Sequence, residues 1–521
     1  MKNVLFLLMT FFVTNLFAQD NVKIEWGEAN KNQSFTNRIL GETDDEVVTL
    51  ASKGKDFYIE IYDKQKLSLK NSYEFSLPEE HEKKTEIEKI HFFPKSGKIL
   101  LFTSLYVKKK NNIYYYEVSL KGKVGKSNLL LEIDVENKRR SGDFGFEVGL
   151  DENTILVYHT STLKKEKAKQ IRVKVIDDSF EVVADLEDKI PMKEAKREVF
   201  VDNFTFDQNG YIHMLVAKPT NTYTDFFIYT YDSKDGYSKD MQSIILDKDH
   251  VIISLALAVN QQQNLVAVGY YMNKMKAFTM PRIQGVFSYI YNPEEQKEVY
   301  KKFIAYTDED YQSAYGKEAK KYKKGIPLTH FIMDIVLADN GEIVLVSESR
   351  LFAQTNVMDQ YKYQDILVTR MSKDGTLIWL KSIPKRQVFT RPKLTLGGTT
   401  GAGGISITLS FSIALMKDKS IYLSYLMAAK NGTYYFIYND NPKNIITPID
   451  EKPKVMANLD RGVPTLVTIK QDGTMKREVL YGAKNDELIL RPRINKKVDE
   501  NTIYVYGNRK KLDKIGRVEL E

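Results

Sequence analysis

Cysteine is absent from the 521 residues of this chain, and its absence removes several kinds of structure and chemistry at once. Without thiols there is no disulfide bridge, no thiolate nucleophile, no cysteine-ligated metal and no acylated cysteine near the N-terminus. The six histidines are scattered and show no H-E-x-x-H spacing, and no G-x-S-x-G turn of a serine hydrolase occurs. We therefore expect no metal, no cofactor and no hydrolase domain.

Long apolar runs are also lacking. No segment after the N-terminus reaches the 18 continuous apolar residues that indicate a membrane helix. The N-terminus carries Lys2, an apolar stretch from Val4 to Phe17 and the small residue Ala18, which is the pattern of a cleaved secretory signal over residues 1–18. A retained anchor is the weaker alternative, because the stretch is shorter than the roughly 20 residues that span a bilayer. We expect an exported protein, either periplasmic, associated with the outer membrane, or extracellular.

The charge balance is mildly basic, with a net charge of +8 and a pI near 8.9. The lysines fall in short runs, which we interpret as solvated loop surface, with contact to lipid or nucleic-acid phosphates as the alternative. Nucleic acid is not expected, because none of the known binding signatures occurs.

A repeated phrase of two hairpins organises the rest of the chain. Its clearest turns are Asp207-Gln208-Asn209-Gly210 in a first hairpin and Asp374-Gly375 in a second. Anchors placed on the first apolar residue after each first turn are 52 to 82 residues apart, which fits propeller blades with insertions. These anchors are Val47, Ile99, Ile155, Ile212, Leu265, Ile343, Ile421 and Ile503. The sequence predicts an all-β fold, a single closed β-propeller over residues 19–521 with about eight four-stranded blades, or alternatively seven.

The two ends of the chain predict how the ring closes. After residue 486 there is room for three strands only, Leu488 to Lys496, Thr502 to Gly507 and Ile515 to Glu521, while Val22 to Trp26 is a spare strand. An N-terminal strand that completes the last blade removes an unpaired edge. An open stack of sheets or two sandwich domains is the alternative, but no linker rich in Pro, Gly or Ser divides the chain.

Loop lengths indicate which side of the propeller carries function. Turns between the first and second and between the third and fourth strands are short, whereas long segments fall on the opposite, loop-rich face. Insertions are expected near 310–329, 388–404 and 431–464, with a short helix over Asp308 to Lys324. Inserted loops on a rigid scaffold commonly bind partners, although neutral drift is an alternative.

Aromatic and arginine side chains cluster in these insertions, and Tyr beside Arg is typical of protein interfaces. A glycine-rich loop follows them, where backbone amides can approach a partner closely. The alternatives are that the aromatic rings pack the insertions onto the disc and that the glycines form a plain turn. The candidate binding residues are Tyr311, Tyr315, Tyr322, Arg350, Tyr361, Lys362, Tyr363, Phe389, Arg391, Gly397, Gly398 and Gly401.

Four carboxylates, Asp143, Glu147, Asp202 and Asp334, lie on or next to predicted innermost strands. If they converge on a central channel, burial and mutual repulsion raise a pKa as acid–base chemistry on a glycan or lactone requires. A water-filled channel lined with charge is the alternative.

The chain resembles secreted Bacteroidota propeller proteins of unknown function, with WD40-like or YVTN-like architecture, in its signal and in its Asp-x-Asn-Gly and Lys-Asp-Gly turns. No functional residues follow from this resemblance. We expect a non-catalytic scaffold that binds an envelope or outer-membrane protein complex through its loop-rich face. A glycan-active or lactone-active enzyme and a non-catalytic glycan binder are the alternatives.

Overall fold

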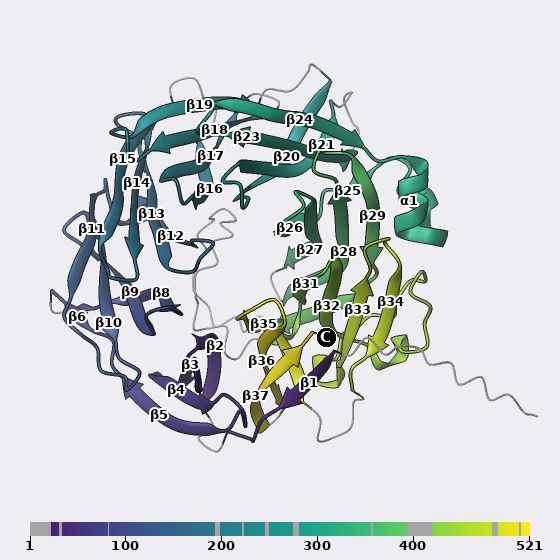
Figure 1. Ribbon diagram of the computed structural model, residues 1–521, viewed down its shortest axis with the longest axis horizontal. Coiled ribbons are helices and arrows are strands. Elements are labelled where there is room, and N and C mark those ends of the chain that lie inside the picture. The colour runs from purple at the N-terminus through teal and green to yellow at the C-terminus, as the bar shows by residue number, and fades with distance from the viewer. Residues whose placement is uncertain are drawn as a thin grey trace, which may run out of the picture.

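The computed structural model describes residues 22–30, 34–81, 83–192, 198–220, 223–244, 249–274, 281–355, 358–392, 419–481, 488–509 and 512–520. In these residues, eight antiparallel sheets of four or more strands stand around a common centre (Figure 1). This arrangement is a β-propeller, and the predicted all-β fold is confirmed. The number of sheets equals the larger of the two blade numbers expected from the repeat.

Each sheet is a meander whose strands follow one another from the centre outward, apart from the last sheet, which takes its outermost strand from the N-terminus. The first four sheets are β2 Phe35–Glu42, β3 Glu46–Lys53, β4 Asp56–Asp63 and β5 Leu69–Phe75; β8 Glu86–Phe93, β9 Lys98–Val107, β10 Lys110–Val118 and β11 Asn128–Asp134; β12 Asp143–Val148, β13 Thr154–Leu163, β14 Ala168–Asp177 and β15 Val182–Pro191; β16 Phe200–Phe206, β17 Tyr211–Pro219, β18 Thr224–Asp232 and β19 Ser238–Ile244. The other four are β20 His250–Val259, β21 Leu265–Asn273, β23 Gly285–Asn292 and β24 Lys297–Ala305; β26 His330–Leu337, β27 Ile343–Gln354, β28 Met358–Met371 and β29 Leu377–Ile383, with β30 Gln387–Pro392 added to β28; β31 Leu426–Lys430, β32 Thr433–Asp440, β33 Val463–Ile469 and β34 Met475–Val479; β35 Ile489–Lys497, β36 Thr502–Arg509, β37 Leu512–Glu519 and β1 Lys23–Trp26.

Closure of the ring follows the prediction. The N-terminal strand β1 pairs with β37, with Trp26 opposite Gly516, and so completes the last sheet. A core cluster joins this sheet to the first one, since Val47 and Tyr62 pack with Tyr504 and Ile515. Burial of large apolar side chains between neighbouring sheets therefore continues across the junction of the chain ends.

The repeated turns explain why the sheets form where they do. Gly210 has φ 93° and Gly473 has φ 81°, in the left-handed region that a hairpin turn uses and that glycine adopts without steric cost. Seven of the eight anchors lie in the second strand of a sheet, but Ile421 lies in the 3₁₀ helix η4 Lys419–Tyr422, so that anchor is wrong. The first turn of this sheet is instead Asn431-Gly432, both with positive φ, the pair that favours a two-residue hairpin.

The three longest connections start and end on the loop-rich face, and residues 393–418 of the second lie outside the described residues. Residues 306–329 link β24 to β26, residues 384–425 link β29 to β31, and residues 441–462 link β32 to β33. Residues 433–440, within the range expected for the third insertion, form β32 because they continue the Asn-Gly hairpin.

In the part of the chain that the structure describes, helices and minor strands occur only in connections. The first long connection contains α1 Asp308–Tyr315, η2 Gly316–Lys321 and β25 Ile326–Pro327, the last paired with β22 Arg282–Ile283. The remaining short elements are η1 Lys138–Arg140, η5 Pro442–Asn444, η6 Leu459–Arg461 and the pair β6 Glu79–Glu80 with β7 Lys83–Lys84.

Candidate functional site

The sixth sheet along the chain extends beyond its neighbours on the loop-rich face. Strand β26 stops pairing with β27 at His330 and Ser349. Beyond this point β27 and β28 continue to pair with each other, and β30 pairs with the added part of β28. We call residues 350–354, 358–363 and 387–392 the sheet extension. Its rows across the three strands are Arg350, Tyr363 and Gln387; Phe352, Tyr361 and Phe389; and Gln354, Asp359 and Arg391. Because alternate residues of a strand point to one face, these rows share a face.

The middle row is a line of three aromatic rings. The ring centroids of Phe352 and Tyr361 are 4.9 Å apart, and those of Tyr361 and Phe389 are 6.0 Å apart. Tyr361 and Phe389 pack against a buried cluster that includes Tyr422 and Leu423, whereas Phe352 is 52% exposed. One end of the row is thus anchored and the other is open to solvent.

Arginines flank this row on both sides. Arg391 forms an ion pair of 2.9 Å with Asp359 at the outer end of the extension. At the inner end, the Arg350 guanidinium lies 4.9 Å from the centre of the Tyr363 ring, and Arg493 of β35 donates a hydrogen bond of 3.2 Å to the Tyr363 hydroxyl. Cations over an aromatic face stabilise the inner end of the extension against the last sheet.

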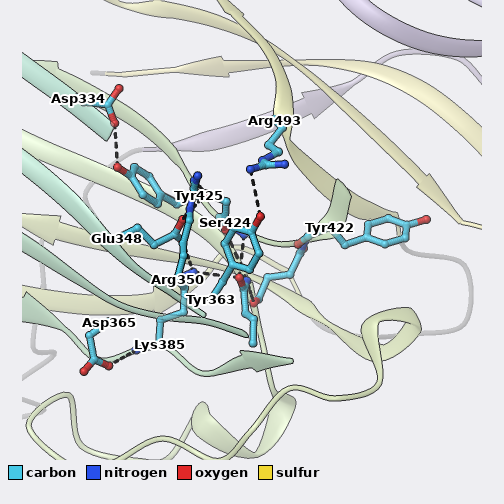
Figure 2. A network of polar contacts seen from close by, with 12 residues as sticks. Asp334, Glu348, Arg350, Tyr363, Asp365, Lys385, Tyr422, Ser424, Tyr425 and Arg493 are labelled. Atoms are coloured by element: carbon cyan, nitrogen blue, oxygen red, sulfur yellow. Dashed lines mark hydrogen bonds and ion pairs between the residues drawn. The ribbon is translucent and has the colours of Figure 1, made fainter. Parts of the chain in front are cut away.

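A buried ionic network lies beneath this inner end (Figure 2). Glu348 and Lys385 are fully buried and form an ion pair, and Arg350 donates a hydrogen bond of 2.7 Å from Nε to the other carboxylate oxygen of Glu348. The Ser424 hydroxyl donates to the same oxygen at 2.8 Å, and Lys385 also donates to Gln387 at 3.0 Å. The network connects β27, β30 and the segment before β31, which are far apart in the sequence.

Burial and charge act against each other at Glu348. Burial alone raises a carboxyl pKa, but Lys385 and Arg350 outweigh it, so the pKa of Glu348 is lowered. Burial lowers the pKa of Lys385, and Glu348 partly offsets that effect. The lowered pKa of Glu348 favours its ionised form, and its bonds to Lys385 and Arg350 position the sheet extension.

The structure divides the predicted binding residues into groups. Arg350, Tyr361, Tyr363, Phe389 and Arg391 lie together on one face of the extension, and Lys362 lies on its other face. Tyr311 and Tyr315 are 3% and 8% exposed and pack α1 onto the sheets, with Tyr322 stacked on Tyr315, so these rings serve mainly as core. Gly397, Gly398 and Gly401 lie outside the described residues.

Sequence reasoning missed the buried part of the site. Glu348, Lys385, Ser424 and Arg493 carry no motif, and they meet only because the fold brings three sheets together. The one available signal was the basic pair Lys385-Arg386 shortly after an apolar strand. Such a pair is equally typical of a solvent-exposed loop, so it does not indicate a buried ion pair.

The four candidate carboxylates lie on innermost strands, as expected, but in different sheets. Asp143 and Glu147 are on β12, Asp202 is on the next inner strand β16, and Asp334 is on β26. Loss of hydration raises the pKa of Glu147 to about 7; the positive charge of Lys89 opposes this rise, and Asp202 adds a smaller increase.

Asp334 belongs to a separate environment. It accepts a hydrogen bond of 2.8 Å from the Tyr425 hydroxyl, and burial raises its pKa. The described strands thus place Asp143, Glu147 and Asp202 in neighbouring sheets and Asp334 next to the network of Figure 2.

No helix within the described ranges has the length and apolar character to cross a membrane. In the same ranges, no three His, Asp or Glu side chains are grouped as a metal ion requires.

The sequence matches no protein-family model and no curated protein. Solved structures resemble its fold. An uncharacterized protein from Listeria monocytogenes is 11% identical with a TM-score of 0.38, covering 81% of this chain and 89% of its own. The β-propeller domain of the Trilobed protease from Pyrococcus furiosus is 10% identical with a TM-score of 0.35, covering 87% and 98%. A polysaccharide lyase is 10% identical with a TM-score of 0.36, covering 94% and 90%. These likenesses carry no argument about function.

Proposed function

We propose that this protein is an exported binding protein that holds a partner protein of the cell envelope on its sheet extension. The signal-like N-terminus supports the export, and the geometry of the extension supports the binding. The observation on which the proposal rests is an exposed apolar strand edge on the loop-rich face.

That edge belongs to the added part of β27. Strand β26 pairs with β27 only as far as Ser349, and in the described residues no strand pairs with residues 351–354 on the side away from β28. Leu351 is 42% exposed, Phe352 is 52% exposed and the nearby Met358 is 40% exposed. Proteins usually shield such an edge, since its free amide and carbonyl groups and apolar side chains invite a further strand. A partner segment that adds a strand here gains main-chain hydrogen bonds and an apolar anchor at Phe352.

The buried network supports recognition rather than bond breaking. Glu348 is held charged between two cations, and its oxygens are already bonded to Lys385, Arg350 and Ser424. A carboxylate in this state is a poor proton donor or acceptor, but it is well placed to hold the extension rigid and so reduce the entropy lost on binding.

The test is crosslinking in native cells followed by mass spectrometry, with wild type, the double variant Leu351→Ser/Phe352→Ser and Leu150→Ser. Leu150 is a matched control, because it is 62% exposed and lies in the turn between β12 and β13, on the opposite side from the long connections. We expect a specific partner crosslinked to the extension in wild type and Leu150→Ser and lost in the double variant. A partner retained by the double variant would overturn the proposal. Arg350 is unsuitable for such a test, because its replacement also disturbs Glu348.

A further inference from the structure

The loop-rich face carries a patch of basic side chains over the second and third sheets, which are neighbours in the ring (Figure 1). Three connections form it: the turn 108–109 between β9 and β10, residues 136–140 between β11 and β12, and the turn 164–167 between β13 and β14. Together these residues contain eight basic and two acidic side chains. We call them the basic patch.

The three connections lie against one another. The Val135 amide donates a hydrogen bond of 2.9 Å to the Lys109 carbonyl oxygen, which joins the first turn to the start of the second connection. The Lys165 amide donates to the Glu136 carboxylate at 3.0 Å, which joins the second connection to the third. The patch is therefore one continuous surface rather than three separate runs of lysine.

Most of the positive charge in the patch is unpaired. Both of its acids are already used, since Glu136 pairs with Arg140 at 2.7 Å and Glu166 pairs with Lys189 at 2.7 Å. The other seven basic side chains are exposed and form no ion pair with any described residue: Lys108, Lys109, Lys138, Arg139, Lys164, Lys165 and Lys167. Like charges gathered on one surface repel one another, and an anionic partner relieves that repulsion.

Three of these lysines occupy backbone positions that suit lysine poorly. Lys108, Lys109 and Lys167 have φ of 48°, 64° and 51°, in the left-handed region where a Cβ is costly. The corresponding turn of the seventh sheet is Asn431-Gly432, the pair that favours a two-residue hairpin. Backbone strain of this kind is concentrated at functional positions, so its presence here supports a role for the lysine charge.

The composition of the patch indicates the class of partner. Its residues include no aromatic side chain to stack on a nucleic-acid base and no large apolar side chain to anchor a protein, and lysine is itself depleted at protein interfaces. A bilayer surface with lipid phosphates requires neither, because clusters of about four to eight basic side chains bind it by charge. We propose that the basic patch docks the loop-rich face onto an anionic lipid surface. This inference does not depend on the partner proposed for the sheet extension, which belongs to the sixth sheet.

Co-sedimentation of the purified full chain with vesicles tests the inference, using phosphatidylcholine alone or mixed with phosphatidylglycerol. We expect binding to the mixed vesicles only. This binding should be lost when the ionic strength rises from about 0.1 M to about 1 M, because the Debye length falls from about 10 Å to about 3 Å.

The variant Lys108→Asn/Lys109→Gly separates charge from folding. It removes two charges and gives the turn its favoured pair, so its thermal stability should be at least that of wild type. Each lost charge should weaken binding to the mixed vesicles about fivefold, and the double variant about 25-fold. Lys121→Gln/Lys123→Gln is the matched control, since these two exposed lysines follow the other end of β10, on the opposite face.

The control variant and Leu351→Ser/Phe352→Ser should both bind mixed vesicles as wild type does, and a loss in either that equals the loss in Lys108→Asn/Lys109→Gly would overturn the inference. Absence of vesicle binding, equal binding to the two kinds of vesicle, or an unchanged affinity in Lys108→Asn/Lys109→Gly would also overturn it. Tighter binding to single-stranded DNA at the same phosphate concentration would assign the patch to nucleic acid instead.

Discussion

Lys385 donates a hydrogen bond from Nζ to Oε1 of Glu348, and both side chains are fully buried. The pair joins one long connection to the sixth sheet, since Lys385 precedes β30 and Glu348 lies on β27 beside the strand bulge where the sheet extension begins. A buried ion pair contributes little net stability compared with an apolar pair of the same shape. Removing one partner is different, because the other charge is left buried.

Lys385→Met should therefore destabilise the protein by about 3 kcal/mol, the lower part of the range for a broken buried pair, because Arg350 still compensates Glu348. Urea unfolding measures this change in the free energy of unfolding. The double variant Lys385→Met/Glu348→Gln should recover part of the loss. As a control, Lys189→Met breaks an exposed pair with Glu166 and should change the free energy of unfolding little, because solvent screens that pair. Equal effects of Lys385→Met and Lys189→Met would contradict this account.

Trp26 closes the ring by lying over two glycines, Gly507 and Gly516. A Cβ on Gly516 would lie 2.6 Å from the Trp26 ring and 3.1 Å from the Glu25 carbonyl oxygen, so β1 has no space to accept it. Gly516→Ala should lower stability by about 1 to 3 kcal/mol through overpacking and expose β1 to protease. Trp26→Leu/Gly516→Ala should lose less than the two single changes added together, since the clash is shared. Thermal unfolding with limited proteolysis measures both effects, and additive losses would show that the contact is not formed.

The fold could be predicted largely from turns. Glycines at Gly210, Gly341, Gly375 and Gly473 all have positive φ, so the residue type reports directly on the backbone. Strand β1 is predictable because the last sheet otherwise lacks a fourth strand. The anchor at Ile421 is wrong because polar residues precede it as they precede the true anchors, while the stronger signal is the Asn431-Gly432 pair that follows.

The site was only half predictable, and the reason is burial. Tyr and Arg in an insertion indicated an interaction surface, and four such residues, Arg350, Tyr361, Tyr363 and Arg391, lie on one face of the extension. Tyr311 and Tyr315 also lie in an insertion, but the face of α1 that carries them packs into the core. No local pattern distinguishes these cases, nor does any local pattern place Ser424 beside Glu348, 76 residues earlier in the sequence.

His159 should make the protein less stable in mild acid. It is fully buried, and its Nε2 donates to the Ser141 carbonyl at 2.6 Å, while Nδ1 has no partner among the described residues. Burial lowers its pKa to about 4, whereas an unfolded histidine titrates near 6.5. The unfolded chain therefore takes up the proton first, and stability falls as pH drops from about 6.5 to 4.

Comparison with His159→Gln isolates this effect, because glutamine can still donate to Ser141 but does not titrate. The free energy of unfolding of wild type relative to the variant should fall by about 1.4 kcal/mol per pH unit in that window. Urea unfolding between pH 4 and 8 provides the measurement. Parallel pH profiles for the two proteins would mean that His159 is accessible to protons in the folded state.

Asp365 should give the opposite dependence on pH. Burial raises its pKa to about 6 in the folded protein, above the value near 3.9 of an unfolded aspartate. The folded state therefore holds the proton more tightly, and the stability that this contributes is present at low pH and is lost as pH rises from about 4 through 6. Asparagine does not titrate, so Asp365→Asn should gain stability relative to wild type over that window and keep a constant difference above it.

Asp374→Asn is the matched control. Hydrogen bonds from Ser372 and Thr376 lower the pKa of Asp374 to about 2, so the stability difference between this variant and wild type should be nearly flat above pH 5. A flat profile for Asp365→Asn as well would show that water reaches this carboxylate freely in the folded protein.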